Sequence, residues 1–127
     1  MMFPKAQLGR NPAFRELAHG KPCMLRIPGV CCGNPETTVL AHSNQGVHGK
    51  GKSLKSGDEF GVWGCYTCHT WLDQGNAGRE EKSQAFAVAM DRMEAELLKI
   101  AGDVLAKKRD RDAATWALNR LVEFYLS

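Results

Sequence analysis

The stretch GCYTCHTWLD, residues 64–73, contains two cysteines separated by two residues and followed at once by a histidine. This spacing lets a tight turn direct two thiolates at one tetrahedral zinc ion. Two sulfurs do not complete such a site, so further ligands must come from elsewhere in the chain. The protein has five cysteines and opens without the apolar run of a secretory signal. In a reducing compartment an odd number of cysteines favours metal binding over a disulfide framework.

The missing ligands are expected in PCMLRIPGVCC, residues 22–32, where cysteines flank a Pro-Gly turn. We expect a structural zinc ion bound by Cys23, Cys31, Cys65 and Cys68, although spacing alone does not separate Cys31 from Cys32. Structural zinc would contribute several kcal/mol to the folding of so small a chain. The alternative interpretation is a set of ordinary buried cysteines. A redox role is disfavoured because no thioredoxin-like βαβ pattern surrounds the pair.

Short strands and helices are predicted around these cysteines. Strands are expected at Met24–Ile27 and Thr37–Ala41, with the Pro-Gly turn after the first. A short helix is expected to begin at Pro12, with Asn11 as its N-cap, and to stop at Gly20. A second helix is expected over the residues TCHTWLD, which directly follow the first cysteine of the pair and its tyrosine.

The remainder of the chain, from about Glu80, is predicted to form a helical hairpin. Its first half carries an apolar stripe with helical spacing, made of Phe86, Met90, Met93, Leu97, Ile100 and Val104. Its second half repeats the spacing at Ala114, Leu118, Leu121 and Tyr125, after a charged connection at 107–112. We therefore expect an α+β protein with a zinc-bound core and N-terminal arm at 1–78 and a helical extension at 79–127. The extension would pack on the core, on a partner or on a second copy.

Charge is distributed unevenly along the chain. Residues 1–56 carry eight Lys or Arg against two acids, whereas residues 57–127 carry nine against twelve. The glycine-rich loop at 43–56 holds Lys50, Lys52 and Lys55, which are candidates for contacts with DNA phosphates. No apolar run reaches the ~18 residues of a membrane span. The expectation is a cytoplasmic protein whose basic half faces a nucleic acid.

Two histidines and an aspartate add the elements of hydrolytic chemistry. His42 ends the second predicted strand, and His69 and Asp73 are four residues apart on the predicted helix, so they share one face. The pair on the helix could hold a divalent ion while His42 acts as general base on a water molecule. Each residue has a simpler reading: His69 could replace a thiolate at the zinc, His42 could be a strand-end residue, and Asp73 an exposed acid.

The two blocks PCMLRIPGVCCGNPETTVLAHSN and GDEFGVWGCYTCHTWLD, separated by the basic glycine loop, resemble a family of small phage and prophage HNH nucleases. These are the YbcO-like proteins and the nuclease module of the recombination-enhancement protein Ref. The resemblance covers roughly Arg15 to Gly78. It implies a ββα-metal (HNH, His-Me finger) core with structural zinc that cuts DNA with Mg²⁺ or Mn²⁺ during phage recombination. For the Ref branch it also implies dependence on a RecA filament.

Carried over by position, the resemblance makes His42, Asp58, His69 and Asp73 the catalytic residues, with His69 and Asp73 holding the divalent ion. Two positions depart from the usual pattern. Asp58 falls near the place of the central Asn, where an aspartate could orient His42 or bind metal but cannot donate as an amide does. Ala41 precedes His42, where many HNH enzymes carry a metal ligand.

Two further classes of function are compatible with these residues. A non-catalytic zinc-containing module would bind DNA in a salt-sensitive way and lose binding when zinc is removed. A recombination adaptor would instead bind a protein partner through the helical extension and have no DNA affinity. Cleavage that disappears in His42→Ala separates the nuclease from both.

Overall fold

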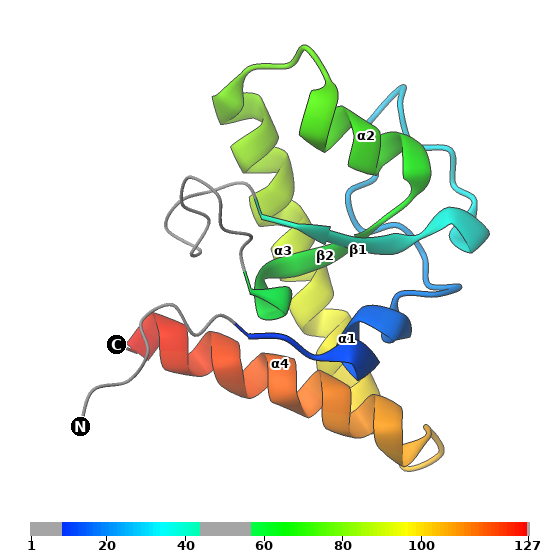
Figure 1. The fold of residues 1–127 in the computed structure, drawn as a ribbon, viewed down its shortest axis with the longest axis vertical. Helices are drawn as coiled ribbons and strands as arrows, with labels where there is room; N and C mark the ends of the chain where they lie inside the picture. The colour runs from blue at the N-terminus through cyan, green and yellow to red at the C-terminus, as the bar shows by residue number, and fades with distance from the viewer. Residues whose placement is uncertain (1–8, 44–56, 127) are drawn as a thin grey trace.

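The computed structural model describes residues 9–43 and 57–126. Its elements, in chain order, are the helices, 3₁₀ turns and strands α1 (Pro12–Leu17), η1 (Pro35–Thr37), β1 (Val39–His42), η3 (Asp58–Phe60), β2 (Gly61–Gly64), α2 (Tyr66–Gln74), α3 (Arg79–Ala101) and α4 (Lys108–Leu126). Figure 1 shows a small α+β fold in which α2 and α3 lie near a short sheet and α4 crosses beside α1. The α+β class and the C-terminal helical hairpin are confirmed.

The sheet is an antiparallel pair of four-residue strands, β1 and β2, in which Val39 pairs with Gly64 and His42 with Gly61. This register places His42 opposite the first residue of β2, directly after η3. All four residues of β2 are buried, including Trp63 with no exposed area. Trp63 also donates its backbone N–H to Met93 Sδ at 3.4 Å, which connects the sheet to α3.

The prediction of a strand at Met24–Ile27 is wrong. The segment lies beside β2, where Met24 N–H donates to the Trp63 carbonyl at 2.7 Å. Its own carbonyls are bonded differently, because Arg92 Nη1 of α3 donates to Met24 O at 2.6 Å and Leu25 O at 3.3 Å. Arg26 also adopts a positive φ of 48°. A left-handed residue and carbonyls bonded to a side chain cannot continue a ladder of backbone hydrogen bonds.

The second predicted strand is confirmed with shifted ends. Thr37 belongs to η1 and the strand runs from Val39 through His42. The first helix is also confirmed, because the Asn11 side chain caps it by accepting from Phe14 N–H at 3.1 Å. After α1 the chain turns at Gly20, whose φ is +77°. Both predictions about the ends of α1 are confirmed because Asn is a favourable N-cap residue and Gly adopts a left-handed turn without steric cost.

The two long helices pack through a shorter stripe than the sequence predicts. The buried residues are Phe86, Ala89, Met93 and Leu97 in α3, and Ala113, Ala114, Ala117 and Leu121 in α4. Val104, 80% exposed, and Tyr125, 65% exposed, are not part of it.

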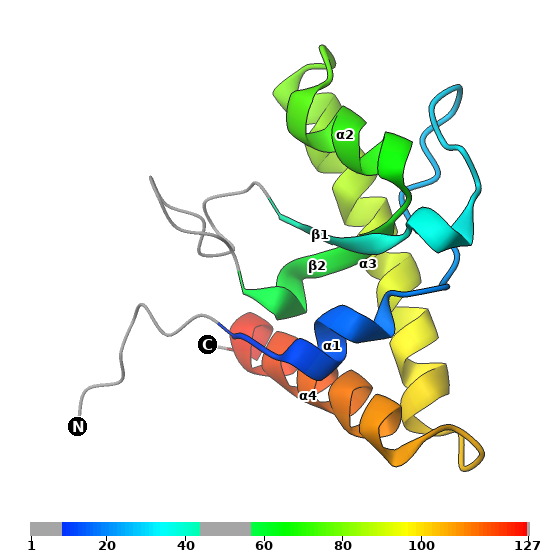
Figure 2. The same ribbon diagram turned by 45° about the vertical axis from the view of Figure 1, so that its right-hand side comes forward.

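The predicted charged connection at 107–112 is wrong, because α4 already begins at Lys108. Alanines on α4 let its axis approach its neighbours closely, and α4 contacts α1 and η3 as well as α3 (Figure 2).

No helix in the described part of the chain is long and apolar enough to cross a membrane.

Candidate metal centre and candidate active site

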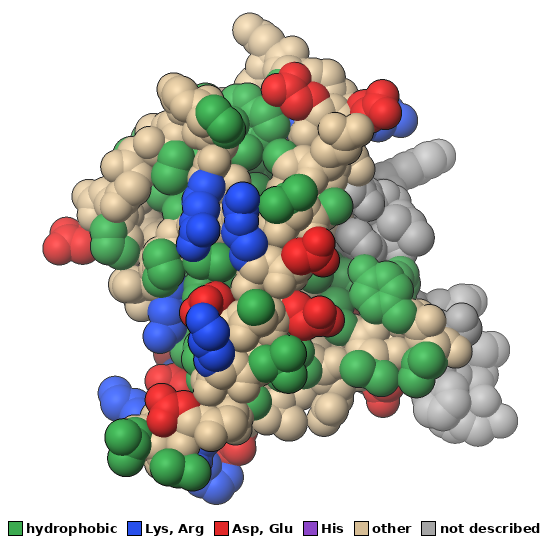
Figure 3. All heavy atoms as spheres, turned by 180° about the vertical axis from the view of Figure 1, so that it is seen from behind, with side chains coloured by type: hydrophobic (Ala, Val, Ile, Leu, Met, Phe, Trp, Pro, Cys, Tyr) green, Lys and Arg blue, Asp and Glu red, His purple; other side chains and the backbone are tan. Residues whose placement is uncertain are grey.

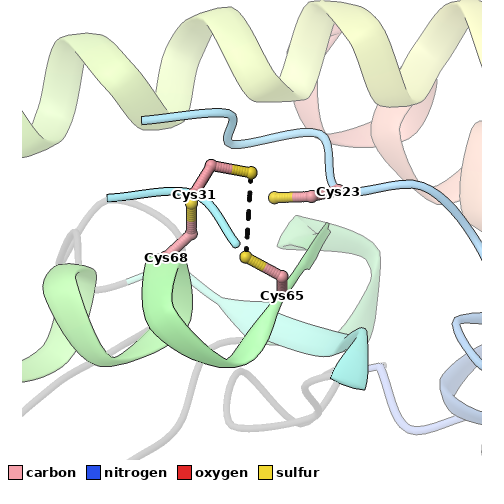
Figure 4. Close-up of side chains that lie close together, drawn as sticks. All are labelled: Cys23, Cys31, Cys65 and Cys68. Atoms are coloured by element: carbon pink, nitrogen blue, oxygen red, sulfur yellow. Dashed lines mark hydrogen bonds between the residues drawn. The ribbon is translucent and has the colours of Figure 1, made fainter. Parts of the chain in front are cut away.

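Four cysteines converge on one point between the turn after α1 and the start of α2 (Figure 4). The sulfurs of Cys23, Cys31, Cys65 and Cys68 all lie within 4.8 Å of one another. The Cys65 and Cys31 sulfurs are 3.8 Å apart. Thiolates about 2.3 Å from a tetrahedral zinc ion lie about 3.8 Å apart, so the spacing fits such a site. These four cysteines could therefore hold a metal ion, as the sequence predicts.

Local backbone geometry directs these sulfurs inward. The positive φ of Arg26 lets its N–H donate to Cys23 Sγ at 3.4 Å, and Ile27 N–H donates to Cys68 Sγ at the same distance. Cys65 is the N-cap of α2 and Cys68 lies in its first turn. Backbone N–H groups and the positive end of a helix dipole both stabilise thiolates. The surroundings of the sulfurs thus suit a thiolate-bound cation.

Without a metal ion, the sulfurs would not all be ionised. Burial acts to raise the pKa of Cys65, but hydrogen bonds from Thr67 and from backbone N–H groups lower it to about 5. Burial and the nearby Cys23 raise the pKa of Cys68 instead. Burial likewise raises the pKa of Cys31. A bound cation would favour the deprotonated form of all four, so metal binding should release protons.

The fold resolves the ambiguity between the adjacent cysteines. Cys31 is half-buried and belongs to the cluster, whereas Cys32 is exposed and its sulfur lies 3.7 Å from Thr37 Oγ1. The turn that separates Cys23 from Cys31 is closed by Val30 and Cys31, whose N–H groups both donate to the Ile27 carbonyl. The Pro-Gly turn is thus confirmed, although no strands flank it.

A second group of polar residues surrounds the carboxylate of Asp58. His42 Nε2 lies 2.8 Å from Asp58 Oδ1, so the end of β1 and the turn η3 are joined by their side chains. The other oxygen, Oδ2, accepts from Asn11 N–H and from Arg15 Nη1, each at 2.7 Å. The Asp58 side chain is 1% exposed, against 28% for His42. The N-terminal arm, β1 and η3 therefore meet at one buried carboxylate.

These contacts keep Asp58 ionised and select the tautomer of a neutral His42. Burial acts to raise the pKa of Asp58, but hydrogen bonds from Asn11, His42 and Arg15 outweigh it and hold that pKa below its ordinary value. Asp58 is therefore ionised at neutral pH and can only accept. His42 must then donate through Nε2–H. In neutral His42 this leaves Nδ1 unprotonated and able to accept a proton.

His69 and Asp73 form a separate pair on α2. His69 Nε2 lies 3.1 Å from Asp73 Oδ2, one helical turn away, and the side chains are 36% and 41% exposed. His69 is not a member of the cysteine cluster. In the stretches 9–43 and 57–126, that cluster is the one group of three or more His, Cys, Asp or Glu whose ligand atoms converge. The structure therefore pairs His42 with Asp58 and His69 with Asp73, but does not assemble all four into one ligand set.

Sequence reasoning missed several residues around Asp58. Asn11 and Arg15 lie more than 40 positions away along the chain, and the only local signal was the Asn-Pro start of α1. The neighbouring Glu59, 5% exposed, was missed too and pairs with Arg120 Nε of α4 at 3.0 Å. Lys50, Lys52 and Lys55 lie outside the described residues.

Comparison with known proteins places most of this fold in one family. A family model described as "Putative nuclease YbcO" matches residues 12–101. The matched range contains all four clustered cysteines and both histidine-aspartate pairs. It ends before α4, so Arg120 lies outside it.

Individual relatives agree with this match. A 62-residue region is 46% identical to proteins named putative nuclease YbcO in Escherichia coli (strain K12) and in Enterobacteria phage 82. That region is 48% of this chain and 62% of each relative, so somewhat less than two thirds of their length is spanned. A solved structure, described as a putative bacteriophage protein from Escherichia coli str. K-12 substr. MG1655, superposes with a TM-score of 0.52 at 32% identity. The superposition covers 67% of this chain and 95% of the solved one.

Proposed function

The chain belongs to the YbcO nuclease family, and on that premise we propose that it is a metal-dependent DNA endonuclease of the HNH type. The observation that carries this proposal is the bond between His42 and the buried, ionised Asp58. A histidine at the end of a strand, held by a carboxylate and partly open to solvent, is equipped to remove a proton from water. The strand pair followed by α2 has the order of elements expected of a ββα-metal core.

In the proposed reaction, His42 Nδ1 accepts a proton from a water molecule while Asp58 holds the imidazole through Nε2–H. The water oxygen attacks the phosphorus, and the bond to the leaving oxygen breaks. Asp58 stabilises the imidazolium that forms, and general base catalysis of this kind contributes about 10²–10⁴-fold. His42 could deliver that proton, through solvent, to the leaving oxygen.

His69 and Asp73 are proposed to bind Mg²⁺ or Mn²⁺ as an exposed nitrogen and oxygen pair. Such an ion, when bound, stabilises charge on the phosphate and on the leaving oxygen. Because two protein side chains are few ligands for such an ion, oxygen atoms of the DNA phosphate and of water would supply the others. The four cysteines would hold zinc, because an all-sulfur tetrahedral set favours that metal.

We further propose phosphate contacts from Lys50, Lys52 and Lys55, because these lysines belong to a basic, glycine-rich stretch of the sequence. We also propose action in the cytoplasm of the host cell. A role in phage recombination and use of a RecA filament are what the resemblance implies. The division into a core at 1–78 and an extension at 79–127, which could also form an oligomer, remains a prediction.

The deciding experiment is cleavage of supercoiled and single-stranded DNA by the zinc-loaded protein, with Mg²⁺ or Mn²⁺ and with or without a RecA filament. Wild type is compared with His42→Ala and with a matched His19→Ala control, because His19 is exposed and lies outside the site. Cutting that is lost only in His42→Ala supports the nuclease. If wild type and both variants bind DNA in a salt-sensitive way but none of them cuts it, a zinc-containing binding module is favoured instead.

A further inference from the structure

We infer that Arg15 contacts a DNA phosphate at the site of cleavage while its guanidinium stays anchored on Asp58; the inference rests on the proposed function. Arg15 Nη1 lies 2.7 Å from Asp58 Oδ2, and the opposite oxygen of that carboxylate bonds His42. The guanidinium is thus separated from the proposed general base by one carboxyl group. A phosphate placed for attack by water near His42 would lie close to it.

The exposure of Arg15 supports a role beyond neutralising Asp58. Its side chain is 43% exposed, while the carboxylate that it contacts is 1% exposed. A guanidinium has five N–H donors in a rigid fork. Across residues 9–43 and 57–126, the one side chain that its guanidinium bonds is Asp58, through Nη1. The donors that remain are therefore available on the solvent side.

The ion pair with Asp58 would order the Arg15 side chain before a DNA phosphate binds. Ordering a free arginine side chain costs up to about 2 kcal/mol of rotamer entropy, and the bond to a buried carboxylate offsets part of that before DNA arrives. The planar fork suits a phosphate, to which it can donate two parallel hydrogen bonds. Asp58 also has Asn11 N–H and His42 as donors, so Arg15 can share its guanidinium between Asp58 and a phosphate without leaving the carboxylate short of donors.

A second arginine, paired with the acidic residue of α1, provides the comparison. Arg109 is 54% exposed and lies 2.9 Å from Glu16, which is 58% exposed. This is also an arginine-carboxylate pair at the surface of α1, but its carboxylate is not bonded to a histidine. The face of the molecule opposite to the one seen in Figure 1 shows no histidine among the described residues, and its charges of both signs are interspersed with apolar side chains (Figure 3). The inference therefore applies to Arg15 and not to exposed arginines in general.

The test measures DNA affinity against salt concentration for a labelled duplex of about 20 base pairs, with every variant made in the zinc-loaded His42→Ala protein so that DNA is not cut. The variants are Arg15→Gln, Arg15→Lys and the control Arg109→Gln. Loss of one phosphate contact lowers the slope of log affinity against log salt by about 0.9. We expect that loss in Arg15→Gln, a near-normal slope with weaker affinity in Arg15→Lys, and no change in Arg109→Gln.

A slope in Arg15→Gln equal to that of its parent would overturn the inference, and so would a parent protein with no measurable affinity at low salt. Cleavage by the protein with an intact His42 is scored separately, so failure of the nuclease proposal is recognised independently. Zinc content and far-ultraviolet circular dichroism confirm that each variant is folded. If the only role of Arg15 is its ion pair with Asp58, Arg15→Gln in the protein with an intact His42 should change the pH profile of kcat and leave KM unchanged. A raised KM in that variant supports phosphate contact.

Discussion

Asp58 Oδ1 lies 2.8 Å from His42 Nε2, although the two residues belong to different elements on either side of a long segment of chain. His42 ends β1 and Asp58 begins η3, and the pairing of His42 with Gly61 brings these two ends together. A buried carboxylate beside a strand-end histidine selects one tautomer of that histidine. The predictions below begin from this pair.

Replacing Asp58 by asparagine should impair catalysis more than folding. The Asp58→Asn side chain keeps the shape of the carboxylate but can present an N–H to His42, which permits the tautomer with the proton on Nδ1. We expect kcat to fall by about 10²-fold or more, in line with the general contribution of a positioned base. Single-turnover cleavage measures this, with zinc content as the folding control. A variant that cuts at the wild-type rate would remove Asp58 from the mechanism.

The same carboxylate should make stability depend on pH. Because its pKa in the folded protein is lower than the ordinary value of about 3.9, ionised Asp58 stabilises the fold above that ordinary value. The contribution is lost as the pH falls through the folded pKa. The difference in unfolding free energy between wild type and Asp58→Asn should thus be larger at about pH 6 than at about pH 3. Urea unfolding at both values checks this, with Asp112→Asn as an exposed ion-paired control.

Adjacent cysteines should respond oppositely to the same substitution. Cys31→Ser removes one of four clustered sulfurs, whereas Cys32→Ser alters an exposed side chain outside the cluster. We expect about one zinc ion per chain in wild type and Cys32→Ser, and reduced zinc content with a lower Tm in Cys31→Ser. Elemental analysis and thermal unfolding provide the measurements. Equal zinc loss in both variants would contradict the assignment of Cys31.

The ion pair between Glu59 and Arg120 should hold α4 against the turn that carries Asp58. Glu59 is 5% exposed, so Arg120→Met leaves a nearly buried carboxylate without its cation. We expect a loss of about 1–3 kcal/mol in unfolding free energy, part of which the double variant Glu59→Gln/Arg120→Met should recover. Lys108→Met, whose pair with Asp112 is mostly exposed, should change stability by less than about 0.5 kcal/mol. A loss in Arg120→Met no larger than in Lys108→Met would rule this role out.

Where the sequence alone misled, the physical reason can be named. Met24–Ile27 is as apolar as a strand, but a left-handed Arg26 and hydrogen bonds from Arg92 prevent a ladder there. The real partner of β1 is GVWG, residues 61–64, whose buried side chains show no alternation of polar and apolar residues. A four-residue strand buried on both faces carries too little periodicity to be found from sequence.

By itself, the sequence determined the features that depend on neighbouring residues. Asn11 caps a helix, the Pro-Gly turn separates two cysteines, and the spacing of Cys65 and Cys68 places both sulfurs at the start of α2. These follow from local backbone geometry. Only the tertiary structure decided between Cys31 and Cys32, and it alone brought Arg15, His42 and Asp58 together. Such choices depend on packing between segments far apart in the chain, where burial of one carboxylate requires donors from several elements at once.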